Sequence, residues 1–344
     1  MQYDAVLFVS FGGPEGKDDV MPFLENVLRG KNVPLQRMKE VAHHYDLFGG
    51  VSPLNGQNRR LISAIKEDLK KNGIDLPVYW GNRNWHPMLT DTVRIMKDDG
   101  VKRALAFVTS AYGSYSGCRQ YLEDIDKARN EVGEDAPVID KLRVFYNHPG
   151  FIEANVAHLN ESLNAIPAER RKSVHVAFTA HSIPLSMAET SDYEAQLLEA
   201  SRLVAVACDV SDWNLVFQSR SGPATQPWLE PDILDHMRDV AHRKIKDVVI
   251  LPIGFVSDHM EVIYDLDTEA SSVAGKAGIN MERASTAGTH PAFIKMIRQL
   301  ISERLNDAEE KLCSGERGAA PNVCHPDCCP RPVRPVPAPS NTSA

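Results

Sequence analysis

The sequence predicts an α/β protein of two similar lobes, each a parallel sheet flanked by helices, with an active-site cleft between the lobes. First, short β-branched runs alternate with amphipathic segments of helical length, the pattern of a parallel sheet wrapped by helices. Second, most of these runs are continuously apolar, as strands covered on both faces are. Third, the apolar runs of both halves of the chain stop abruptly at Gly, Ser, His or Asn.

The expected strands occupy residues 5–10, 77–81, 104–110, 175–180, 215–219, 248–253 and 280–284. Helices are expected between them wherever apolar residues recur at helical spacing. One covers residues 61–69 and ends before Gly73, and another covers residues 293–301.

A weak internal repeat divides the chain. Three early strands end in SFGGP, GNRNWHP and TSAYGSYS, and three later ones end in TAHSIP, QSRSGP and PIGFVSDH. We therefore expect an N-terminal lobe of residues 1–149 and a C-terminal lobe of residues 150–310. Residues 311–344 form a Cys- and Pro-rich tail, with disorder expected over residues 330–344. Ligands of such sheets bind at the carboxyl ends of the strands, so the residues there are site candidates.

Composition narrows the function classes. The 344 residues are 43% hydrophobic and 24% charged, with a net charge of −8, so there is no basic field for nucleic acid or anionic lipid. The apolar runs are too short to cross a bilayer. No basic stretch precedes an apolar segment at the start of the sequence, so the cytoplasm is the expected compartment.

His181 is the first candidate functional residue. It directly follows an apolar strand in VHVAFTAHSIP, and the Ser-Ile-Pro after it favours a turn that aims the ring into a cleft. An imidazole placed there accepts protons or binds a metal near neutral pH. The alternative is a histidine that closes the strand and bonds to a neighbouring carbonyl.

A stripe of acidic residues is the second candidate. In LPIGFVSDHMEVIYDLDTEA a strand ends, Ser257 or Asp258 is expected to cap a helix, and Glu261, Asp265 and Glu269 then fall on one helix face. A solvated acidic face is the alternative. Because the stripe begins within a turn of the strand end, it suits the passage of hard cations and released protons into a cleft.

Five sequence motifs occur along the chain, and together they are more specific than any one of them alone. TAHSIP, FQSRSGP with PWLEP, PIGFVSDHMEVIYDLD, LFVSFGGPEG and HYDLFGGVSPLNGQ resemble the ferrochelatase family, and the resemblance runs from about Ala5 to Ile301. It implies a heme-biosynthesis enzyme that inserts Fe²⁺ into a porphyrin and releases two protons. It also implies that His181 and Glu261 are the catalytic, metal-binding pair. Asp265 and Glu269 would carry metal ions or protons behind them.

The resemblance also assigns porphyrin-binding residues. Ser52 and Tyr121 match residues that face the macrocycle, and Tyr45 and Arg29 match residues near its propionates, where a guanidinium would bind carboxylate. His44 replaces an arginine that binds propionate in some relatives, so its contribution should be weaker and dependent on pH. Without the resemblance, Ser52 and Arg29 would be taken as a turn hydroxyl and a surface charge.

The substrate is expected to be coproporphyrin III, giving Fe-coproporphyrin III (coproheme). The sequence lacks the long apolar lip of membrane-bound relatives, as the Gram-positive bacterial branch does. Protoporphyrin IX is the alternative substrate, and a non-catalytic tetrapyrrole carrier and a cobalt or nickel chelatase are alternative functions. The expected partners are the small-molecule substrates and neighbouring heme-pathway enzymes.

Four cysteines crowd the tail: Cys313, Cys324, Cys328 and Cys329. Some ferrochelatases hold a [2Fe–2S] cluster through three cysteines of such an extension, which implies a cluster here. Those relatives take a fourth ligand near the helix that starts at Gly150, where this sequence has Ala154, so all four tail cysteines are the alternative set. Structural zinc and free thiols remain open. Cys118 and Cys208 are expected to be small apolar packing residues.

Overall fold

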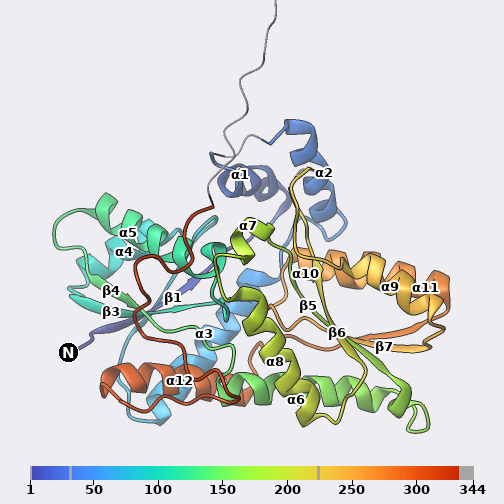
Figure 1. The fold of residues 1–344 in the computed structure, drawn as a ribbon. Coiled ribbons are helices and arrows are strands. Elements are labelled where there is room, and N and C mark those ends of the chain that lie inside the picture. The colour runs from blue at the N-terminus through green and yellow to red at the C-terminus, as the bar shows by residue number, and fades with distance from the viewer. Residues whose placement is uncertain (1, 31–32, 223–224, 333–344) are drawn as a thin grey trace, which may run out of the picture.

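Two parallel four-stranded sheets form the centre of the computed structural model, which describes residues 2–30, 33–222 and 225–332 (Figure 1). The first has the order β2–β1–β3–β4 and contains β1 (Ala5–Ser10), β2 (Val78–Asn82), β3 (Arg103–Val108) and β4 (Val138–Lys141). The second has the order β6–β5–β7–β8 and contains β5 (His175–His181), β6 (Trp213–Gln218), β7 (Asp247–Leu251) and β8 (Asn280–Arg283). Because the two orders are equivalent, the predicted pair of similar α/β lobes is confirmed.

Helices cover both sheets. Those of the first half are α1 (Lys17–Val27), α2 (Leu35–Asp46), α3 (Leu54–Lys71), α4 (Leu89–Asp98), the π-helix η1 (Tyr115–Arg119) and α5 (Gln120–Val132). Those of the second half are α6 (Pro149–Ala165), the 3₁₀-helix η2 (Arg171–Ser173), α7 (Leu185–Ala188), α8 (Tyr193–Ala207), α9 (Ile233–His242), α10 (Met260–Val262), the π-helix η3 (Ile263–Ala270), α11 (Ser271–Ala277) and α12 (Pro291–Leu305). π-Helical turns are rare and are frequent at functional sites. Here η1 contains Cys118, and η3 contains Asp265 and Glu269 of the acidic stripe.

The seven predicted strands are all present, with ends within two residues of the expected ones. The predicted helices lie within α3 and α12. Strand β4 was missed. Its sequence, VIDK, is short, half polar and incompletely buried because the strand lies at the edge of the sheet, so no apolar run marks it.

A single apolar core extends beneath both sheets. It joins Phe8 and Phe107 of the first sheet to Phe178 of the second through the rings of Phe145 and Phe293. Helix α12 packs against both α6 and α3. The lobe boundary proposed at residues 149 and 150 lies at the start of α6, between the two sheets.

The tail runs back over the body as an irregular segment (Figure 1, dark red). Asn147 Nδ2 donates to the carbonyl of Gly318, and Arg119 donates to the carbonyl of Cys328. Residues 333–344, most of the segment predicted to be disordered, lie outside the described residues. No helix in the described ranges is long and apolar enough to cross a membrane.

His148 makes the stability of the fold depend on pH. It is wholly buried at the start of α6, where Nδ1 accepts a hydrogen bond from the Gly150 N–H at 3.1 Å. Burial, and then the charge of Arg143, lowers the pKa of His148 to about 4. The unfolded chain therefore binds the proton first as pH falls. The free energy of unfolding should drop by about 3 kcal/mol between about pH 6.5 and pH 4 on account of this residue alone.

Urea unfolding across that pH range tests this expectation in His148→Asn, which keeps a cap acceptor but cannot take up a proton. The variant should lose less stability on acidification than the wild type does. Equal losses in the two proteins would show that His148 is not responsible.

Candidate active site at the strand ends of the second lobe

His181 and Glu261 face each other. His181 ends β5, Glu261 lies in α10, and the His181 Nε2 and Glu261 Oε2 atoms are 3.6 Å apart. The other ring nitrogen, Nδ1, lies 2.5 Å from the Ser182 carbonyl oxygen. A carbonyl oxygen only accepts, so Nδ1 carries the proton and Nε2 is left as the proton acceptor. Both side chains remain partly open to solvent, at 33% and 52% exposure.

Close packing after β7 brings α10 to this position. A Cβ atom on Gly254 would lie 2.6 Å from the Ala180 Cα, so only glycine lets this turn pass directly over the end of β5. The predicted cap at Ser257 or Asp258 is wrong. The Asp258 carboxylate pairs with Arg283 at 3.3 Å, and His259 Nδ1 instead accepts the hydrogen bond from the Glu261 N–H.

The acidic stripe is only partly solvated: Glu261 is exposed, and Asp265 and Glu269 are half-buried. The Asp265 carboxylate accepts hydrogen bonds from Ser219 Oγ at 2.5 Å and from Gln218 Nε2 at 3.3 Å. Burial, with the charges of Glu261 and Glu269 and against the Ser219 hydrogen bond, raises the pKa of Asp265 to about 7. Burial also raises the pKa of Glu269. A carboxyl group with a pKa near 7, as Asp265 has, exchanges protons near neutral pH.

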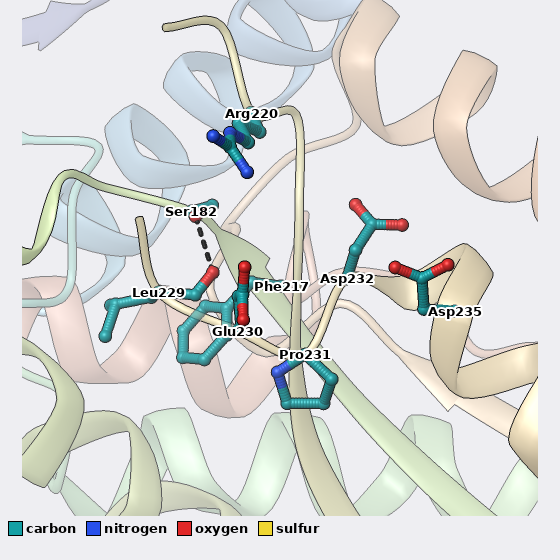
Figure 2. A pocket seen from close by; sticks show the side chains of 8 residues that line it. All are labelled: Ser182, Phe217, Arg220, Leu229, Glu230, Pro231, Asp232 and Asp235. Atoms are coloured by element: carbon teal, nitrogen blue, oxygen red, sulfur yellow. Dashed lines mark hydrogen bonds between the residues drawn. The ribbon is translucent and has the colours of Figure 1, made fainter. Parts of the chain in front are cut away.

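A cavity of about 450 Å³ adjoins the outer end of the stripe. Its wall contains Glu230, Asp232, Asp235 and Arg220, and Figure 2 shows the carboxylates of Asp232 and Asp235 on one side with Arg220 away from them. The charge of Asp232 adds to the rise in the pKa of Glu269. Asp232 therefore lies near enough to Glu269 for the charges of the cavity wall and of the stripe to interact.

Two of the predicted porphyrin-binding residues lie against α10 and η3, the helical segment that bears the acidic stripe and that we call the acidic helix. The ring of His44 stacks on Tyr264 with centroids 3.8 Å apart, and burial lowers the pKa of His44. Tyr45 packs in an apolar cluster with Met260, and burial, with the charge of Glu261, raises the pKa of its phenol. Helix α2 of the first lobe thus contacts the acidic helix of the second.

The other three predicted porphyrin-binding residues, Ser52, Tyr121 and Arg29, make no hydrogen bond or ion pair with the acidic stripe within the described part of the chain. Ser52 is buried and its N–H donates to the Pro14 carbonyl. Tyr121 is buried in α5. Arg29 is exposed and bonds to Asn26 of the preceding turn at 2.5 Å, not to another predicted site residue.

Arg83 was not singled out from the sequence. Its guanidinium lies 4.4 Å from the centroid of the Tyr121 ring and 5.9 Å from that of Phe11, and it pairs with Asp124 at 2.6 Å. The signal that could have found it is GNRNWHP, in which only the end of a strand was recognised.

Cys118 is buried in the apolar core, as predicted for a packing residue, and it also lies beside the Cys324 thiol of the tail. Interaction with the Cys324 thiol, and then the charge of Lys141, lowers the pKa of Cys118. Cys328 Sγ lies 3.5 Å from Cys329 Sγ, and Cys329 also feels the charge of Cys118. We call Cys118, Cys324, Cys328 and Cys329 the thiol group.

Cys313, one of the predicted cluster ligands, makes no contact with another thiol among the described residues. Asn147 and Arg143 hold its neighbours Ser314 and Leu312 before the tail reaches η1. Within residues 2–30, 33–222 and 225–332, no three His, Cys, Asp or Glu side chains are arranged as ready ligands of one metal ion.

A solved structure shares the fold. The cobalt complex of the sirohydrochlorin chelatase SirB from Bacillus subtilis subspecies spizizenii aligns with a TM-score of 0.53 at 11% identity. The alignment covers 91% of this chain and 99% of SirB. At this identity the similarity supports the two-lobed architecture alone.

Sequence relatives are much closer. The family model described as Ferrochelatase matches residues 3–305. A ferrochelatase of Rhodopirellula baltica is 59% identical, covering 95% of this chain and 93% of its own. A coproporphyrin III ferrochelatase of Streptomyces coelicolor is 50% identical, covering 98% and 96%. This chain therefore belongs to the ferrochelatase family of enzymes.

Proposed function

We propose that the protein inserts Fe²⁺ into coproporphyrin III, forming coproheme and releasing two protons. The observation that carries the proposal is the contact of His181 with Glu261 at the end of a partly buried acidic stripe. Relatives from Streptomyces coelicolor and Nocardia farcinica, 50% and 48% identical, are coproporphyrin III ferrochelatases. Their similarity favours the same substrate here.

His181 is suited to remove the pyrrole protons. Its Nδ1–H bond to the Ser182 carbonyl fixes the ring and leaves Nε2 as the base. Glu261 offers a carboxylate oxygen to the iron on the same side, so the ion can exchange water for protein and then for pyrrole nitrogen stepwise. Each proton that leaves the porphyrin thus meets a base where the metal arrives.

The cavity wall and the acidic stripe provide the approach for iron and the exit for protons. The cavity wall at Asp232 leads to Glu269 and then to Asp265, which lies one step behind Glu261. Hard oxygen donors suit ferrous iron, and a carboxyl group with a pKa near 7 accepts protons readily. We propose that ferrous iron enters and protons leave along these carboxylates.

We propose that the macrocycle is seated by residues of the first lobe. Tyr45 and His44 lie beside the acidic helix, and the buried Ser52 and Tyr121 lie near Gly13 after β1 and Thr109 after β3. The exposed guanidinium of Arg29 is available to a propionate. A tetracarboxylate such as coproporphyrin offers more partners for such groups than protoporphyrin does.

An anaerobic assay with coproporphyrin III and protoporphyrin IX side by side tests the proposal. Loss of the free-base absorption bands on adding Fe²⁺ should be faster with coproporphyrin. Bound porphyrin that stays metal-free with either substrate would favour a carrier. Preferential insertion of Co²⁺ or Ni²⁺ in competition would assign the protein to another chelatase class.

We also propose a [2Fe–2S] cluster bound by the thiol group. The proposal rests on the nearness of thiols from two segments: Cys118 of η1 interacts with Cys324 of the tail, and Cys328 Sγ lies 3.5 Å from Cys329 Sγ. Arg119 bonds to the Cys328 carbonyl and so presents this stretch of the tail to Cys118. When bound, the cluster would supply a redox-sensitive cross-link between the tail and η1.

Replacing Cys118 by serine should abolish the visible absorption of the cluster and the acid-labile sulfide bound per chain, because a ligand from the body is lost. Cys313→Ser and Cys208→Ser are matched controls that should retain both signals. A cluster that survives in Cys118→Ser and disappears in Cys313→Ser would contradict this ligand set. Metal analysis that finds zinc without sulfide would replace the cluster by a zinc site.

We propose the cytoplasm as the compartment in which the enzyme acts. The cysteines are unpaired and the substrate iron is ferrous, which suits reducing surroundings. Neighbouring heme-pathway enzymes, which supply the porphyrin and consume the metallated product, are the proposed partners.

A further inference from the structure

A buried glutamine links the two halves of the candidate active site. We propose that Gln218, the last residue of β6, is a positioning residue that sets the separation of the His181 imidazole and the Glu261 carboxylate. The inference rests on the proposed function, in which these two groups act on one macrocycle. Gln218 is fully buried, so its contacts are made within the protein.

The main chain of Gln218 holds the strand that bears the imidazole. Gln218 pairs in register with His181 in the parallel ladder of β5 and β6. Its carbonyl then accepts a hydrogen bond from the Ser182 N–H at 2.8 Å. Since the Ser182 carbonyl in turn holds His181 Nδ1, the orientation of the ring follows from the position of Gln218.

The side chain of Gln218 holds the helix that bears the carboxylate. Its amide nitrogen donates to the Glu261 carbonyl and to Asp265 Oδ2, each at 3.3 Å. An amide has two donor hydrogens, so both bonds form at once. One residue therefore ties the end of β5 to the start of α10 and η3.

The amide has only one satisfactory orientation. If it were flipped, its oxygen would face the Glu261 carbonyl, which only accepts, and the donor bond to that carbonyl would be lost. As it lies, Gln218 Oε1 is buried and has no hydrogen-bond partner among the described residues. A buried acceptor without a partner is unfavourable. The structure accepts this cost at Oε1, and in return the amide nitrogen keeps its bonds to Glu261 and Asp265.

The next residue reinforces the link. Successive side chains of a regular strand point to opposite faces. Ser219 instead has a left-handed φ of 63°, and its hydroxyl reaches Asp265 as Gln218 does. A non-glycine residue in this region is strained, and such strain gathers at functional sites. Both residues at the end of β6 are thus turned toward the acidic helix.

Two substitutions separate positioning from general stability. Gln218→Met keeps the volume but removes both donors, and Gln218→Glu keeps the shape but places an oxygen against Asp265. Asn155→Leu is the matched control. Asn155 is another fully buried amide of this lobe, with one donor bond to the Phe151 carbonyl at 2.8 Å and an oxygen without a partner in the described chain.

We expect both Gln218 variants to lose about tenfold or more in kcat for iron insertion, with the Kd for coproporphyrin, measured by fluorescence quenching, within about twofold of wild type. Asn155→Leu should stay within about twofold in both. Amide hydrogen exchange over residues 263–270 should be about tenfold faster in Gln218→Met than in the control.

The inference is overturned if both Gln218 variants match the control in kcat. It is also overturned if kcat and porphyrin affinity decline together, since that is the effect of a general structural role. A wild-type protein that metallates no porphyrin refutes the proposed function instead. In that case the exchange measurement alone decides whether Gln218 holds the acidic helix.

Discussion

Replacing His181 by alanine is expected to lower kcat for iron insertion by about a hundredfold or more, because the base that accepts the pyrrole protons is lost. Porphyrin affinity should change by less than about twofold, since the imidazole acts in the chemical step. Stopped-flow metallation under anaerobic conditions measures kcat, and fluorescence quenching measures affinity. Glu261→Gln should behave nearly the same way because it removes the carboxylate opposite Nε2.

His158→Ala is a suitable control, because His158 lies on α6 of the same lobe and pairs with Glu161 rather than with a predicted site residue. If His181→Ala kept more than about a tenth of wild-type kcat/KM, a loss below about 1.4 kcal/mol, His181 would not be the base.

Replacing Glu303 by alanine is expected to destabilise the fold by about 3–5 kcal/mol, because it strands a buried charge. Arg143 and Glu303 are 3% and 8% exposed and form a two-pronged ion pair with contacts of 2.9 and 3.0 Å. Arg143 also donates to the Leu312 carbonyl at the start of the tail. Urea unfolding should therefore show a lower midpoint, and limited proteolysis should cut the tail sooner.

The double variant Arg143→Met with Glu303→Leu provides the comparison. It removes both charges and fills the space with apolar groups, which is often neutral for stability. It should unfold at higher urea than Glu303→Ala. If the two unfold together, the loss comes from the missing side-chain packing and not from the unpaired guanidinium.

The proximity of His181 and Glu261 could be predicted from the sequence for a simple physical reason. Both follow apolar strands, and the carboxyl ends of parallel strands meet at one edge of a sheet. β5 and β7 are in fact neighbours. The same reasoning located Asp265 and Glu269 but not Gln218, because nothing in a sequence shows which side chain reaches across from a third strand.

The thiol group was out of reach of the sequence for the opposite reason. The four tail cysteines are close in the chain, which favoured them as a set. Cys313 is separated from the others by the path of the tail over Asn147, and Cys118 joins them through a contact between distant segments. No local pattern around Cys118 distinguishes a ligand from a packing residue. The cap at Asp258 failed similarly, because its competitor, Arg283, lies on another strand.

The distribution of apolar contacts indicates which helices can move when the substrate binds. The two lobes have equivalent topology, but they share one apolar core, and α12 packs against helices of both. A hinge motion between the lobes would therefore disrupt this shared core. Helices α1 and α2, by contrast, rest on a small cluster of their own that touches the acidic helix through Met260 (Figure 1). Elements with few shared apolar contacts open at the lowest free energy. We therefore expect any adjustment to a bound macrocycle to occur first in this pair of helices.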